Sequence, residues 1–237
     1  MMRIPSMFAA AIVAFAAVPA SAATNIIFTN GVTAVPGYIG NVLAYSNDFG
    51  TPTSPNLGTN YVANSTNTGP DGSEQVSTPG RVRTFSTDVP GSALQPPGST
   101  GNYLAIGAPT SPKAGTFEID FAAGVHVISF LVGSLDEYNS VFLTFVGGAP
   151  NEVYRGGQIT GNVDTDQGLG QQGRVTYDFG NATLSSITFS SDRAAFEIDG
   201  IVAAAPEPAA WLTMILGFGL VGGALRRRRG MGALAAA

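Results

Sequence analysis

Acid, amide and aromatic side chains follow the most continuously apolar segment of the chain, 125–132. Asp136, Tyr138 and Asn139 lie within a few residues of its end. Carboxylate and amide groups can hydrogen-bond sugar hydroxyls while a tyrosine ring stacks on the sugar face. The same residue types form tight turns. The sequence therefore leaves two interpretations, a ligand contact at these three residues and an ordinary turn, and it favours the turn.

Oxygen-bearing side chains alternate at Asn162, Asp164 and Asp166, as at the start of a calcium loop. The next residue is Gln167 where such a loop has glycine, and its twelfth position is Gly173 where such a loop has glutamate. A calcium site here is therefore the minor alternative. We expect a chain that needs no cofactor.

Two segments, 117–120 and 196–199, share the pattern Phe-Glu-Ile-Asp. In a strand, this alternation places Phe and Ile on the buried face and the two acids on the other. If the two strands are neighbours, four carboxylates gather on one face and could bind calcium. Charged residues usually remain solvated, so we expect two exposed strand faces instead.

The chain offers few groups for catalysis. It has no cysteine, which excludes a thiolate nucleophile, a thiolate zinc site and a disulfide scaffold. Its single histidine, His126, lies in the apolar segment without a Gly-x-Ser-x-Gly motif, and we expect a structural role. The segment 168–173 matches Gly-x-Gly-x-x-Gly, but it lacks the strand before and the helix after that a dinucleotide site requires. We therefore predict that the protein is not an enzyme.

The candidate residues above lie among short segments in which apolar and polar residues alternate. Period-two alternation and frequent glycine, with 31 glycines and 15 prolines in the chain, indicate many short strands joined by turns. The region 48–80 is poor in large apolar residues and predicts a long loop. The residues 23–205 thus predict one all-β domain, an antiparallel β-sandwich of jelly-roll-like form. The predicted strands are 25–29, 81–86, 102–106, 116–121, 125–132, 141–146, 152–158, 174–179, 184–190 and 194–202.

The two ends of the chain have the composition of export and membrane segments. Arg3, an apolar run from Met7 and the small residues Ala20 and Ala22 predict a signal peptide over 1–22, cleaved after Ala22. At the other end, 209–225 is apolar and about 26 Å long as a helix, near the lower limit for a bilayer core of about 30 Å. Four arginines follow it, which predicts a transmembrane helix with a cytoplasmic tail at 230–237.

The part between these ends is acidic, because five of the 11 basic residues are Arg3 and Arg226 to Arg229. An acidic surface repels phosphate backbones. Nucleic acid is therefore excluded as a partner.

A proline-glutamate-proline triplet at 206–208 directly precedes the apolar run, a tryptophan follows at 211, and the four arginines end the segment. With this order of residues, the C-terminal segment 206–229 resembles the PEP-CTERM sorting signal in its PEP-x-x-W variety. The resemblance implies recognition by exosortase, an integral-membrane enzyme, cleavage near the Pro-Glu-Pro triplet, and release to the cell envelope or extracellular matrix. The body resembles exosortase-sorted surface proteins with a jelly-roll-like ectodomain, mainly at 130–139. The residues that carry the sorting motif are Pro206, Glu207, Pro208, Trp211, Gly217, Gly219, Arg226, Arg227, Arg228 and Arg229.

These features predict an exported, non-enzymatic protein with a structural or adhesive role in extracellular polysaccharide or biofilm. A carbohydrate-binding module is the alternative, and it needs an exposed aromatic platform at Tyr138 and Tyr103. An envelope hydrolase is the third hypothesis, which two carboxylates facing each other across a cleft would revive.

Overall fold

The computed structural model describes residues 24–30, 41–47, 49, 59–60, 72–76, 81–107, 109, 113–161, 171–206 and 215–221. The predicted signal peptide, the calcium candidates Asn162, Asp164 and Asp166, and most of the sorting signal, including Arg226 to Arg229, lie outside these residues.

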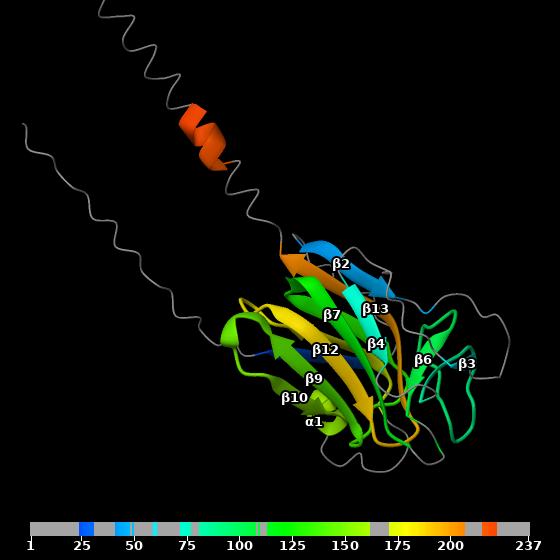
Figure 1. Cartoon of the computed structure of the whole chain (residues 1–237). Helices are drawn as coiled ribbons and strands as arrows, with labels where there is room; N and C mark the ends of the chain where they lie inside the picture. The colour runs from blue at the N-terminus through cyan, green and yellow to red at the C-terminus, as the bar shows by residue number, and fades with distance from the viewer. Residues whose placement is uncertain are drawn as a thin grey trace, which may run out of the picture.

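Two antiparallel sheets form the body of the molecule, one facing the other (Figure 1). Strand order in the larger sheet is β1-β11-β8-β13-β6-β5-β3, and β2 also pairs with β13. Order in the smaller sheet is β10-β9-β12-β7-β4. The larger sheet consists of β1 (Asn25–Asn30), β2 (Asn41–Asn47), β3 (Thr59–Asn60), β5 (Val82–Phe85), β6 (Tyr103–Ile106), β8 (Val127–Val132), β11 (Gly173–Asp178) and β13 (Phe196–Pro206). The smaller sheet consists of β4 (Gly72–Val76), β7 (Gly115–Val125), β9 (Asn139–Phe145), β10 (Glu152–Arg155) and β12 (Leu184–Ser191), and the short helices are η1 (Val146–Gly148) and α1 (Gly156–Thr160).

Aromatic side chains fill the space between the sheets. The rings of Phe130, on β8, and Phe189, on β12, meet edge to face with centroids 4.9 Å apart. Phe189 also contacts Phe117 and Phe196, and all four side chains are fully buried. Burying one such side chain stabilises the fold by about 1.5–3 kcal/mol. The predicted all-β antiparallel sandwich is confirmed, while the jelly-roll form stays a prediction.

The apolar segment 125–132 is divided between the two sheets. All six residues of β8 are buried, as expected for a strand in the middle of a sheet. The placement of His126 within that strand was wrong, since β7 ends at Val125 and β8 begins at Val127. The chain passes from one sheet to the other at His126, whose Nε2 lies 3.0 Å from Thr183 Oγ1. Burial lowers the pKa of His126, and its contact with Thr183 fits a structural role.

The region 48–80 differs from the long loop expected there. The short strand β3 and the edge strand β4 both lie within it, and β4 pairs with β7. On β4, Glu74 is buried and accepts a 2.6 Å hydrogen bond from the hydroxyl of Tyr45. A strand that contributes a glutamate to the interior does not show the alternation of apolar residues on which the prediction depended.

Only 215–221 of the predicted transmembrane segment is described, and it is helical. All seven residues are exposed. Among the described residues, no helix reaches the length and apolar content that crossing a membrane requires.

Candidate functional site

A short hairpin, Asp88 to Gln95, forms one wall of a pocket outside the larger sheet. Val89 and Ala93 exchange backbone hydrogen bonds of 2.8 and 2.9 Å, and the amide of Ser92 donates to Val89 O at 2.9 Å. Pro90 and Gly91 occupy the tip, and Gly91 has φ of 70°. Proline followed by glycine of positive φ is the pattern of a type II turn. The turn sequence and the backbone hydrogen bonds within this segment are therefore enough to specify the hairpin.

Glu197, on β13, connects this hairpin to the larger sheet through a hydrogen bond. Its Oε1 accepts a 2.9 Å hydrogen bond from the backbone amide of Leu94, and its Oε2 accepts one of 2.6 Å from the hydroxyl of Ser134. Gly133 permits the close approach, because a Cβ at that position would lie 1.9 Å from Leu94 O. A residue without a side chain is required wherever two backbones come this close.

The opposite wall is the turn that follows β8. The amide of Asn139 donates to Asp136 O at 2.9 Å, while Asn139 Oδ1 accepts from the amide of Asp136 at 2.6 Å. The hydroxyl of Tyr138 donates to Asp136 Oδ2 at 2.6 Å. The guanidinium carbon of Arg193 lies 4.6 Å from the centroid of the Tyr138 ring, so a cation covers the ring.

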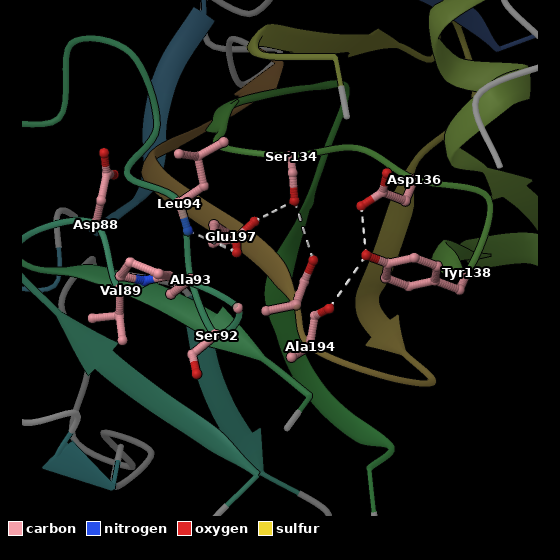
Figure 2. Close-up of a pocket in the computed structure, with 13 residues that line it drawn as sticks. Asp88, Val89, Ser92, Ala93, Leu94, Ser134, Asp136, Tyr138, Ala194 and Glu197 are labelled. Atoms are coloured by element: carbon pink, nitrogen blue, oxygen red, sulfur yellow. Dashed lines mark hydrogen bonds between the residues drawn. The ribbon is translucent and has the colours of Figure 1, made fainter. Parts of the chain in front are cut away.

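Between the two walls lies a pocket of about 400 Å³ (Figure 2). This volume falls within the range of small-molecule sites, about 300–1,000 Å³. The lining combines apolar side chains with carboxylates and hydroxyls. The lining residues are Asp88, Val89, Pro90, Gly91, Ser92, Ala93, Leu94, Ser134, Asp136, Tyr138, Ala194, Ala195 and Glu197.

Two buried carboxylates dominate the electrostatics of the pocket. Glu197 is 2% exposed and Asp136 is 3% exposed. Burial raises the pKa of Glu197 to about 7, and the charge of Asp136 adds to the rise, while hydrogen bonds from Ser134 and Leu94 oppose it. Burial also raises the pKa of Tyr138, together with its hydrogen bond to Asp136. The pocket therefore holds an acid that changes charge near neutral pH.

The structure brings only part of the predicted ligand contact to the pocket. Asp136 and Tyr138 line it, but Asn139 is fully buried and uses its side chain within the turn and toward Ser191 Oγ at 3.1 Å. The turn interpretation thus describes these residues well. Tyr103 is also fully buried and its hydroxyl donates to Thr87 O at 2.8 Å, so it offers no aromatic platform.

The two Phe-Glu-Ile-Asp segments lie in different sheets, the first in β7 and the second in β13. Four carboxylates therefore do not gather on one face. Glu118 and Asp120 are partly exposed, as expected, but the prediction of a solvated face was wrong for Glu197 and Asp199, which are buried. Within the part of the chain that the structure describes, no three acidic or histidine side chains form a group that could hold a metal ion.

Sequence reasoning did not identify Glu197 and Ser134 as members of the site. The local signal was the turn sequence Pro90-Gly91, which predicts a reversal of the chain but not the surface on which the hairpin lies. Glu197 is buried, unlike Glu118, where the hairpin and Ser134 lie against it, and both contacts are long-range.

No family model and no curated protein matches this chain. A solved structure, TmCBM61 in complex with β-1,4-galactotriose, aligns with 56% of this chain and 86% of its own, at 14% identity and a TM-score of 0.29. A similarity of this size supports no conclusion about fold or function, so the site is interpreted from its own geometry.

Proposed function

We propose that this chain is an exported protein of the cell envelope or extracellular matrix, sorted by exosortase, with an adhesive role in extracellular polysaccharide. The observation that carries the proposal is the preformed pocket between the 88–95 hairpin and the turn at Asp136 to Asn139. Its carboxylates and hydroxyls are groups that hydrogen-bond sugar hydroxyls. The pocket is lined mostly by backbone-fixed segments, which reduces the entropy lost on binding.

Hydrogen bonding, and not stacking on an open aromatic platform, is the recognition mode that this pocket supports. Tyr138 is half-buried, its ring lies under Arg193, and its hydroxyl is bound to Asp136. Ser92, by contrast, directly follows the hairpin tip and lines the pocket. We therefore expect a sugar to contact the carboxylates of Asp136 and Glu197 and the side chain of Ser92.

Two described features support the export and sorting part of the proposal. The helix 215–221 exposes large apolar side chains on every side, which is unfavourable in water and favourable in a bilayer. Pro206, the first residue of the sorting motif, is the last residue of β13 and pairs with Asn41. Cleavage after this strand would leave both sheets whole. The exposed side chains are Ile215, Leu216, Phe218, Leu220 and Val221.

Filling the pocket tests its role. The full chain, purified in detergent, is titrated with exopolysaccharide from the producing cells, as the wild type and as Ser92→Trp. We expect the indole to occupy the pocket and reduce affinity by about tenfold or more. Thr100→Trp is the matched control, because Thr100 is exposed and does not line the pocket. Equal affinity of all three proteins would refute the pocket as the polysaccharide site.

The sorting part has a separate test. The C-terminal mass of the protein is measured in cells with and without exosortase. We expect a shortened C-terminus near Glu207 only in cells with the enzyme. A full-length C-terminus in both strains would refute the processing.

A glycoside hydrolase is the second candidate, because Asp136 and Glu197 both line one pocket and burial raises the pKa of Glu197 to about 7. A raised pKa is the property of a general acid in such enzymes. Both Glu197 oxygens, however, accept hydrogen bonds from the protein, which favours binding over proton transfer. Release of reducing sugar from the same polysaccharide, abolished by Glu197→Gln, would establish the hydrolase.

A further inference from the structure

We propose that the pocket selects a saccharide carrying a free ammonium group, a de-N-acetylated amino sugar, over neutral and acidic sugars. This specificity rests on the proposed function, because it names the chemical class of sugar that the same pocket would take.

The charge of the lining carries the inference. Three of the thirteen lining residues, Asp88, Asp136 and Glu197, are acids, and none is Lys, Arg or His. The neighbouring Arg193 lies over the ring of Tyr138 and is not part of the lining. Charge complementarity therefore favours a cationic ligand, and a uronate or phosphate group would be repelled.

Asp136 provides an independent reason. Its Oδ1 is buried and has no hydrogen-bond partner within the described residues, although Oδ2 accepts from Tyr138. A buried carboxylate with incomplete pairing raises the free energy of the empty protein. An ammonium group in the pocket would lower it, because opposite charges attract across the few Å that separate the pocket from this carboxylate.

Binding of an ammonium group should also change the protonation state of Glu197. The charge of Asp136 acts on it, Ser134 and the Leu94 amide donate to it, and its own charge acts on Tyr103 of β6 and Tyr138 of the turn. Asp88 on the hairpin lines the same pocket, and Arg193 lies over the Tyr138 ring. Its neutral form predominates below pH 7, and an ammonium group would favour the ionised form. Binding should therefore release protons near neutral pH, which a neutral sugar would not cause.

The test compares matched ligands. The full chain in detergent is titrated by calorimetry at pH 7 with a glucosamine oligomer, its N-acetylated counterpart and a glucuronate oligomer of equal length. We expect the glucosamine oligomer to bind at least about tenfold more tightly than its counterpart, with proton release, and the glucuronate oligomer not to bind.

Two variants distinguish binding in this pocket from attraction of the ligand to the net charge of the protein. Asp136→Asn should remove most of the preference, whereas Asp192→Asn, which changes the net charge equally at an exposed residue outside the lining, should keep it. Circular dichroism verifies folding, and Asp88→Asn on the partly open rim replaces Asp136→Asn if that variant does not fold. Unchanged preference in the folded pocket variant would overturn the inference.

The outcomes also separate this inference from the proposed function. Equal binding of both amino-sugar oligomers, with loss of both in Ser92→Trp, would overturn ammonium selection and leave polysaccharide binding intact. Absence of binding to every oligomer and to the native polysaccharide would overturn both.

Discussion

The backbone amide of Leu94 donates a 2.9 Å hydrogen bond to Glu197 Oε1 across 103 positions of sequence. This contact joins a locally formed hairpin to a strand of the larger sheet, and the pocket lies beside it (Figure 2). The buried glutamate thus has a structural role, fixing the hairpin, and an electrostatic role, contributing negative charge to the pocket.

Gly133→Ala should disrupt this contact. Its Cβ would lie 1.9 Å from Leu94 O and 3.0 Å from Glu197 Cβ, so the hairpin must move. We expect a loss of about 1–3 kcal/mol in the free energy of unfolding, measured in urea. Gly91→Asn is the control, because Asn tolerates positive φ and nothing lies near that position, and it should lose clearly less. Equal losses would show that the close approach is unimportant.

Glu197→Gln should change how stability depends on pH. Because the folded pKa of about 7 lies above the ordinary value of 4.5, the contribution of this group is fully present below pH 4.5 and is lost as pH rises through 7. The wild type should therefore lose stability over this window, by at most about 1.4 kcal/mol per pH unit, relative to the variant. Unfolding in urea at several pH values measures the difference. Glu118→Gln, in the matching segment of β7, should behave as the wild type does.

Tyr138→Phe removes the hydroxyl that donates to Asp136 Oδ2 at 2.6 Å. Because the acceptor is a buried carboxylate, we expect the free energy of unfolding to fall by about 1–3 kcal/mol. Tyr103→Phe is the control, since its hydroxyl donates only to a carbonyl, that of Thr87. A smaller loss for Tyr138→Phe than for Tyr103→Phe in thermal or urea unfolding would contradict the proposed support of Asp136.

Phe189→Ala should strongly destabilise the sandwich. The side chain is fully buried and contacts Phe130 of the opposite sheet, so its truncation leaves a cavity that costs about 3–5 kcal/mol. Phe142→Ala, on the outer face of the smaller sheet and 40% exposed, should lose much less. Urea unfolding of the two variants measures the contrast, and similar losses would contradict the assignment of the inner and outer faces.

Local alternation was enough to predict most of the sandwich. Segment 116–121 has Phe117, Ile119 and Phe121 at every second position, and 184–190 has Ile187 and Phe189 in the same alternation; both segments are strands with these side chains buried. The prediction failed where polar residues point inward, as Glu74 does on β4, because no local pattern distinguishes a buried glutamate from an exposed one.

The pocket was predictable only in part for the same physical reason. Asp136 and Tyr138 could be identified because they follow the central strand in one turn. Glu197 could not, since its burial depends on the 88–95 hairpin lying over β13, a contact between segments about a hundred residues apart. The identical residue types around Glu118 end on an uncovered sheet face, so sequence alone gives both glutamates the same expectation.

Retention in the extracellular matrix tests the central claim most directly. Producing cells express the wild type or Ser92→Trp, and the amount of exported protein is measured in the matrix and in the free medium. We expect the wild type to remain with the polysaccharide matrix and the pocket-filled variant to appear mainly in the medium. The same distribution for both proteins, at equal levels of export, would contradict the account.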